Sequence, residues 1–259
     1  MPLRPTSLHS RRDAGLQRLT PREQLSAGRL PRRLTQLMVG LTLYGLAMAM
    51  MVRATLGLDP WDVLHIGLVE HTGLSMGTIV IITGFAVLLL WIPLRQWPGL
   101  GTVANAIWIG IATDVGLSVL TEPDALWARV LLMTSAIVVN SIGGALYIGS
   151  QLGPGPRDGL MTGLHTRTGL SIRLVRTCLE LTVLAVGWLM GGVVGVGTVL
   201  YAVAIGPLVQ LFLPWCVVRL DVPESAGGAL VDPLDDAGEH AGVGAREHAV
   251  TEVEDMAGC

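Results

Sequence analysis

Six apolar runs, separated by short clusters of charged residues, proline and glycine, dominate the middle of this 259-residue chain. Each run is close to the length of about 20 residues that an α-helix needs to cross a bilayer. The runs cover roughly residues 35–56, 76–95, 101–120, 127–149, 172–191 and 197–218. The pattern predicts an all-α polytopic membrane protein with six transmembrane helices and the lipid bilayer as its main partner.

Most of the tryptophan residues lie close to the predicted ends of these runs. They are Trp61, Trp91, Trp97, Trp127, Trp188 and Trp215. Aromatic side chains are enriched where a membrane protein meets the membrane–water interface. We therefore interpret these residues as an aromatic belt.

The composition narrows the class of protein further. Apolar residues make up 51% of the chain and charged residues only 14%, whereas about 25% of the residues of a typical soluble domain are charged. So few charges cannot cover a water-exposed surface. The composition therefore argues against a soluble globular enzyme.

The charges are distributed unevenly along the chain. Residues 1–33 contain eight Arg and two acidic residues, and residues 220–259 contain ten acidic residues and one Arg. Neither segment has a sustained apolar period, so we predict a disordered Arg-rich head and a disordered acidic tail. The membrane domain is expected to occupy residues 34–219.

The arginine distribution also predicts an orientation. Cytoplasmic loops of membrane proteins carry an excess of basic residues. With six spans, the head lies on the same side as the Arg-rich segment at 150–172 and as Arg219, while the segment at 57–75 lies on the other side with mostly acidic residues. Both termini are therefore expected in the cytoplasm.

The chain contains an internal repeat at an offset of 96 residues. Residues 56–75 align with residues 152–171 without a gap, and 11 of the 20 positions are identical. The repeats cover about 35–120 and 127–218, with three predicted spans each. Because an odd number of crossings reverses the second copy, the sequence predicts two inverted three-helix repeats. Residues 60–72 and 156–168 are predicted to add one short half-helix to each.

Several segments resemble a known family. Gly57-Leu-Asp-Pro-Trp-Asp-Val-Leu-His65, Gly73-Leu-Ser-Met-Gly77 and Leu152-Gly-Pro-Gly-Pro-Arg-Asp-Gly-Leu-Met161 resemble the YczE branch of the YczE/YyaS/YitT bacterial membrane proteins. Asp59 differs from the Gly expected at that position. The resemblance covers roughly residues 35–215. It implies an uncharacterised multi-pass protein of a bacterial cell membrane and adds no catalytic residues.

The paired Pro-x-Asp segments supply the first candidate site. Asp62 and Asp158 follow a Pro by two positions, with Trp61 and Arg157 between them. In one interpretation the two carboxylates cap the free N–H groups of a helix that begins at the Pro. In the other, the half-helices line a cavity near the centre of the membrane domain and the carboxylates contact a substrate or a coupling ion.

Glu180 is a second candidate, because a charge near the middle of a predicted span usually has a function. Its alternative is an ion pair with Arg176 on the same helix face. Asp114, in the third run, is a further candidate. For it, a helix–helix hydrogen bond or an ion pair with Arg53 is favoured.

No motif of enzyme chemistry is found in the sequence. There is no Gly-x-Ser-x-Gly elbow and no phosphate-binding loop. No His or Cys spacing indicates a metal site. We therefore expect neither an enzyme, a cofactor, a metal nor a nucleic-acid partner. The leading hypothesis is a small secondary transporter or permeation protein with a site for a small molecule or ion at the repeat interface. The alternative is a membrane scaffold or assembly factor for another protein. A second copy of the chain is a candidate partner.

Overall fold

The computed structural model describes residues 20–220, which form helices and no strand. The helices are α1 (Pro21–Ser26), α2 (Leu30–Ala54), α3 (Pro60–Thr72), α4 (Met76–Leu94), α5 (Leu100–Val119), α6 (Leu126–Gly149), α7 (Pro156–Thr168), α8 (Ile172–Leu189) and α9 (Val196–Cys216). Each predicted run forms one long helix, and the two predicted half-helices are α3 and α7. The acidic tail and most of the basic head lie outside the described residues.

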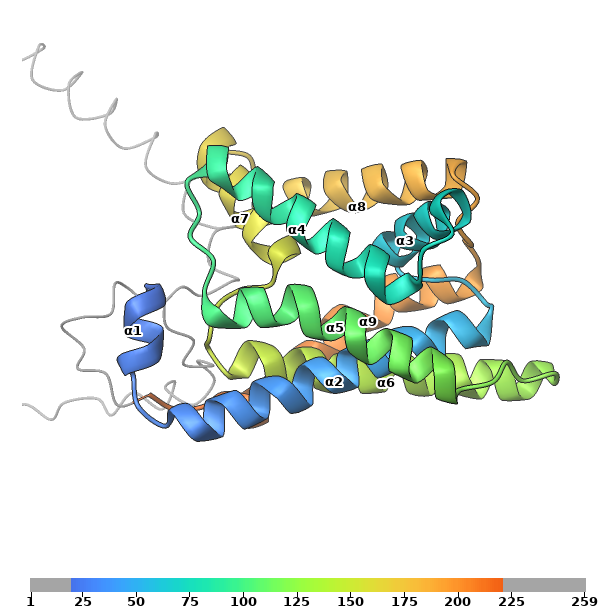
Figure 1. Cartoon of the computed structure of the whole chain (residues 1–259), viewed down its shortest axis with the longest axis horizontal. Coiled ribbons are helices and arrows are strands. Elements are labelled where there is room, and N and C mark those ends of the chain that lie inside the picture. Colours follow the sequence, from blue (N-terminus) through green and yellow to red (C-terminus); the bar gives the residue numbers. More distant parts are fainter. Residues whose placement is uncertain (1–19, 221–259) are drawn as a thin grey trace, which may run out of the picture.

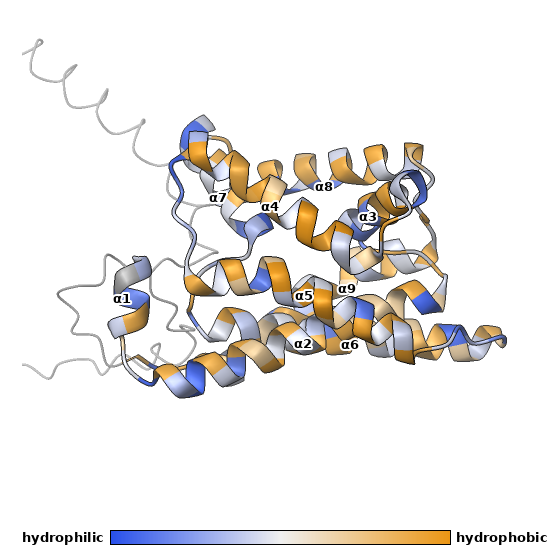
Figure 2. Cartoon of the chain, in the orientation of Figure 1, coloured by the Kyte–Doolittle hydropathy of each residue, from blue (hydrophilic) through white to orange (hydrophobic). Residues whose placement is uncertain are grey.

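Five of these helices are long and apolar enough to cross a membrane: α2, α4, α5, α6 and α9. The helix α8 forms where the fifth span was predicted, but it is not among the five. It carries Arg173, Arg176 and Glu180 within 18 residues. Figure 2 shows hydrophobic residues along the long helices and hydrophilic residues at α1 and in several connections. The chain is thus a multi-pass membrane protein.

The helices form two groups that meet along α4 and α5 (Figure 1). In the first group, α2 packs against α5 and α6, and α6 packs against α9. In the second group, α3 packs against α8, and α7 packs against α4. The α1 helix and the α4–α5 connection lie at one end of the long axis. The C-terminal end of α3 and the α5–α6 connection lie at the other (Figure 1).

Small residues allow α2 and α6 to approach closely. A Cβ atom on Gly143 would lie 2.8 Å from the carbonyl oxygen of Gly40, and one on Gly40 would lie 2.8 Å from that of Gly143. Ala47 and Ala136 are fully buried. Close backbone contact over small residues is a common way to hold membrane helices together. This pair of antiparallel helices therefore forms the centre of the first group, and α5 and α9 pack against it (Figure 1).

The offset of 96 residues recurs in the helix starts. The second set, α6 to α9, begins 96 residues after the first set, α2 to α5, at each of the four helices. Long-range hydrogen bonds recur in the same way. The N–H of Gly101 donates to the carbonyl of Leu152 at 2.7 Å, and the N–H of Gly197 donates to that of Leu56 at 2.8 Å. Each set of helices thus donates the equivalent hydrogen bond to the other set.

The prediction of disorder through residue 33 is wrong for residues 20–33. Thr20 and Glu23 form a capping box at the start of α1, and α2 already begins at Leu30. Arg33 is fully buried and donates to the carbonyls of Ser150 at 2.9 Å and Gln151 at 2.7 Å. These carbonyls lie just beyond the end of α6, where helical partners run out. The guanidinium supplies the missing donors.

Candidate functional site: a cavity between the starts of two short helices

The short helices α3 and α7 begin in the same way. Each has a Pro at its first position, where no helical N–H bond is lost. Each is preceded by a Gly with positive φ: Gly57 at 118° and Gly153 at 117°, a region that side chains disfavour. At Gly57 a Cβ would also lie 2.7 Å from the backbone nitrogen of Gly195. The chain can therefore turn sharply into each helix at the centre of the molecule.

Asp59 caps the start of α3. One of its carboxylate oxygens accepts from the N–H of Trp61 at 2.8 Å and from that of Asp62 at 3.0 Å. The equivalent position before α7 is Gly155, which has no side chain to cap with. The residue that differs from the expected family Gly is therefore the one that performs the capping.

A cavity of about 80 Å³ lies beside these helix starts. One buried water needs roughly 10–15 Å³ by the same kind of measure, so the cavity has room for several. Helices α2 to α7 contribute to its wall, together with Gly155 just before α7. The lining residues are Tyr44, Trp61, His65, Val80, Thr83, Gly84, Val87, Asn105, Ala106, Ile109, Tyr147, Gly155, Pro156, Arg157 and Asp158.

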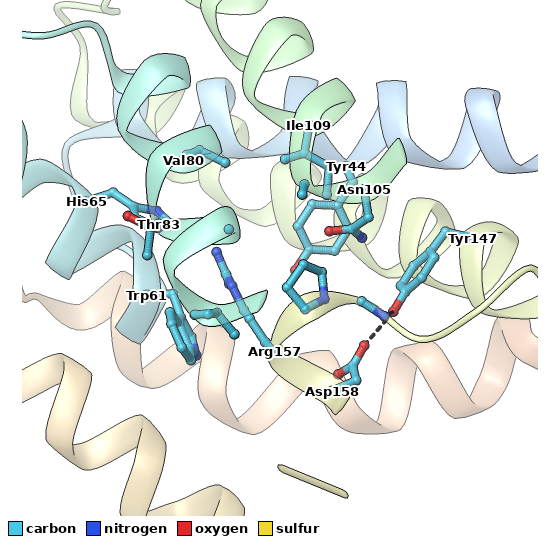
Figure 3. Close-up of a pocket in the computed structure, with 15 residues that line it drawn as sticks. Tyr44, Trp61, His65, Val80, Thr83, Asn105, Ile109, Tyr147, Arg157 and Asp158 are labelled. Carbon is cyan, nitrogen blue, oxygen red and sulfur yellow. Dashed lines mark hydrogen bonds between the residues drawn. The ribbon is translucent and has the colours of Figure 1, made fainter. Parts of the chain in front are cut away.

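Arg157 lies in the middle of this set. Figure 3 shows its side chain between Trp61 and His65 on one side and Tyr44, Asn105 and Tyr147 on the other. The guanidinium carbon lies 4.9 Å from the centroid of the Trp61 ring, a distance suited to a cation–π contact. Trp61 and Arg157 occupy equivalent positions in the two repeats, so these equivalent residues contact each other in the wall of the cavity.

Two carboxylates lie close to the Arg157 guanidinium but do not line the cavity. Its Nη1 lies 3.8 Å from Asp59 Oδ1, and its Nη2 lies 4.0 Å from Asp62 Oδ1. Both distances exceed hydrogen-bond length. The two Asp side chains are 1% and 0% exposed, whereas that of Arg157 is 26% exposed. The positive group thus reaches the cavity, while its counter-charges remain covered.

Asp62 pairs with His65 in this buried layer. His65 Nδ1 lies 3.0 Å from Asp62 Oδ1. Burial raises the pKa of Asp62, against the lowering effect of the Arg157 charge. Burial and the same Arg157 charge lower the pKa of His65. A neutral imidazole that donates its Nδ1 proton to the carboxylate fits these directions.

Asp158 has a different partner. The Tyr147 hydroxyl donates to its carboxylate in a short hydrogen bond, and the same hydroxyl accepts from the N–H of Gly155 at 2.8 Å. Tyr147 thereby links the side chain of Asp158 to the backbone before α7. Neither Asp62 nor Asp158 accepts from a first-turn N–H among the described residues. The capping interpretation is therefore wrong for these two carboxylates: Asp59 binds the first N–H groups of α3, and α7 has no side-chain cap.

Glu180 and Arg176 lie away from the cavity. They form an ion pair at 2.9 Å within α8, with side chains 35% and 53% exposed. The ion pair that we considered as the alternative for Glu180 is therefore present. No residue of this pair lines the cavity.

Asp114 also has a local role. Its carboxylate accepts from the N–H of Gly77 at 2.7 Å and from the Ser75 hydroxyl at 2.6 Å. It thereby joins α5 to the start of α4, which is the helix–helix hydrogen bond that we predict for Asp114 from the sequence. Arg53 instead donates to the carbonyl of Leu117.

Trp91 shows where the aromatic-belt interpretation fails. It is 1% exposed, and its Nε1 donates to the carbonyl of Pro156 at 3.0 Å. Trp61 is also buried, beneath Arg157. Trp97, Trp127, Trp188 and Trp215 are, in contrast, largely exposed. Position near the end of an apolar run does not distinguish an interface residue from one that positions α7.

Sequence reasoning did not place in a site the polar residues that the long helices bring to the cavity: it predicts Asn105 and Asn140 as helix–helix contacts and assigns no role to Tyr44. Tyr44 and Asn105 line the cavity, and their repeat equivalents are Asn140 and Tyr201. The Tyr201 hydroxyl donates to Asn140 Oδ1 at 3.3 Å. A Tyr in one repeat thus aligns with an Asn in the other, twice. This exchange was visible in the alignment, but only the fold shows that one pair faces the cavity.

Comparison with known proteins places the chain in a family. A family of unknown function, DUF6198, matches residues 31–214. An uncharacterised protein of Haemophilus influenzae is 41% identical over 177 residues, which cover 68% of this chain and 81% of the relative. The uncharacterised membrane protein YczE of Bacillus subtilis is 34% identical over 171 residues, 64% of this chain and 78% of the relative.

A more distant relative is the uncharacterised protein YyaS of Bacillus subtilis, which is 24% identical over 180 residues, 68% of this chain and 90% of the relative. No solved structure matches the chain significantly. The resemblance to the YczE branch is confirmed by these relatives. The chain is similar to the bacterial membrane protein YczE and, with most of its membrane domain matched, it belongs to the DUF6198 family of unknown function.

Proposed function

We propose that this chain is a small transport or permeation protein of a bacterial plasma membrane, and not an enzyme. One observation carries the proposal: the starts of α3 and α7 meet at a cavity into which a guanidinium projects. Short helices that end near the centre of a membrane domain commonly line the binding sites of secondary transporters. Irregular backbone at such depth is tolerated where it lines a cavity.

The proposal includes six spans arranged as two inverted repeats. In it, α8 crosses the membrane as the fifth of six spans, with its charged positions close to one end or paired with each other. The alternating direction of the long helices in Figure 1 supports this arrangement. The arginine distribution supports cytoplasmic termini. The cavity then lies at the interface of the repeats, where transporters of this architecture bind their substrates.

Cysteine accessibility tests whether water-soluble molecules reach the cavity. The variant Thr83→Cys is made with Cys178, Cys216 and Cys259 replaced by Ser, because Thr83 lines the cavity. A membrane-impermeant thiol reagent is applied to right-side-out and inside-out membrane vesicles. We expect Thr83→Cys to react from at least one side.

The matched control is Ala136→Cys, which is fully buried against α2 and does not line the cavity. Its labelling should be about tenfold slower or undetectable. If Thr83→Cys reacts no faster than this control from either side, the cavity is closed to solutes. That result would contradict the transport proposal and favour a scaffold or assembly factor.

A further inference from the structure

We propose that the cavity binds a small carboxylate anion with a short apolar tail, and that Arg157 holds the carboxylate. This inference rests on the proposed function, because it names the substrate class of the same site. The juxtaposition that carries it is an accessible guanidinium stacked on Trp61 and facing an apolar wall on α4 and α5.

The first step concerns the unused donors of Arg157. Its two carboxylate contacts are 3.8 and 4.0 Å long, and the structure gives this guanidinium no hydrogen bond to residues 20–220. A guanidinium has five N–H donors in a planar fork that matches a carboxylate. A bidentate carboxylate ligand would satisfy two of these donors at once.

The second step concerns the nearby acidic residues, which could instead favour a cation. Asp59 binds the first N–H groups of α3, Asp62 binds His65, and Asp158 binds Tyr147. Asp59 and Asp62 do not line the cavity. Each keeps one buried oxygen without a partner among the described residues. Asp59 and Asp62 lie behind Arg157, close to its guanidinium. Asp158 does line the cavity, but its carboxylate accepts the hydrogen bond of the Tyr147 hydroxyl, whereas the Arg157 guanidinium keeps N–H donors without a partner among the described residues.

The third step concerns the remaining wall. Val80, Val87, Ala106 and Ile109 form an apolar surface, and Tyr44 and Asn105 place polar groups beside it. A cavity of about 150 Å³ is known to accept benzene, and this one is about 80 Å³. The space therefore suits an acid with about two to four carbon atoms: its carboxylate on Arg157 and its tail on α4 and α5.

The test compares charge classes of equal size on the purified full-length chain. The probes are sodium acetate, propionate and butyrate, the amides acetamide, propionamide and butyramide, and ethylammonium and propylammonium chloride. Binding is followed by isothermal titration and by the melting temperature in detergent at constant ionic strength. We expect saturable binding of at least one carboxylate, and binding of its amide that is at least about tenfold weaker.

Arg157→Lys keeps the positive charge between Asp59 and Asp62 but removes the fork. We expect it to weaken carboxylate binding about tenfold or more. The control is Arg176→Lys in the exposed pair on α8, which should bind as the unaltered chain does. Because Arg157→Lys could fail to fold, the comparison of carboxylates with amides on the unaltered chain stands as an independent measurement.

Three results would overturn the inference: tighter binding of the ammonium probes, equal binding of acids and amides, or no binding of any carboxylate. The last of these, with normal labelling of Thr83→Cys, would reject the substrate class and leave the transport proposal standing. Carboxylate binding without labelling of Thr83→Cys from either side would instead indicate a static anion site. Protection of Thr83→Cys by the bound carboxylate would support both proposals.

Discussion

Arg157 and Trp61 show how one position of a duplicated segment can diverge while the segment keeps its shape. Both residues follow the first Pro of a short helix, and their side chains now contact each other. Asp59 and Asp62 lie beside the Arg157 guanidinium and Asp158 lies beside Tyr147, and each carboxylate has its own hydrogen-bond partner. The chemistry of the cavity therefore comes from differences between the repeats, while its position comes from their similarity.

Trp91 provides the prediction at the scale of a residue. Trp91→Phe removes the hydrogen bond from Nε1 to the Pro156 carbonyl and leaves a buried acceptor without its donor. We expect a loss of about 1–3 kcal/mol in the free energy of unfolding, measured as a lower melting temperature. Trp97→Phe, at an 80% exposed position, should change the melting temperature little. Similar melting temperatures for the two variants would contradict a positioning role for Trp91.

At the scale of the elements, the crossing of α2 and α6 depends on glycine at specific positions. A Cβ on Gly143 would lie 2.8 Å from the carbonyl oxygen of Gly40 and from the nitrogen of Tyr44. Its neighbour Gly144 differs, because a Cβ there would have its nearest atom at 3.8 Å, on Val209. These two adjacent glycines form a matched pair for an experiment.

We expect Gly143→Ala to separate the two helices and to cost about 1–3 kcal/mol, the usual range for overpacking. Gly144→Ala should be tolerated, since an added methyl at that position makes only ordinary contact. The measurement is the yield of folded protein after membrane extraction, together with its melting temperature. Equal behaviour of the two variants would show that the close approach of α2 and α6 contributes little to stability.

At the scale of the whole molecule, the orientation in the membrane is the property to test. Glu70, near the end of α3, and Thr166, near the end of α7, are both exposed and lie in the two repeated segments. The inverted arrangement places Glu70 outside and Thr166 in the cytoplasm. We expect an impermeant thiol reagent to label Glu70→Cys in intact cells, and Thr166→Cys only after the cells are lysed. The other cysteines are replaced in both variants.

Equal labelling of both variants in intact cells would contradict the inverted arrangement. Labelling of Thr166→Cys alone would keep the inversion and reverse its direction. The comparison therefore separates the relation between the repeats from their orientation, which the arginine distribution predicts by a different argument.

The sequence by itself determined the number, the lengths and the order of the main helices. Apolar runs of membrane-spanning length are local signals, and the starts of α3 and α7 are marked by Pro at the first helical position. The repeat is also a property of the sequence, because duplicated residues keep their register whatever they contact. These features depend on neighbours within a few positions along the chain.

Only the tertiary structure decided which polar groups meet. Asp62 and Asp158 occupy equivalent positions, yet one binds His65 and the other binds Tyr147, a residue of α6. Glu180 had the strongest individual signal and lies in an exposed pair outside the cavity. Tyr44, Asn105 and Arg157 come from three different helices. Their convergence depends on how α2, α5 and α7 pack, which no local pattern specifies.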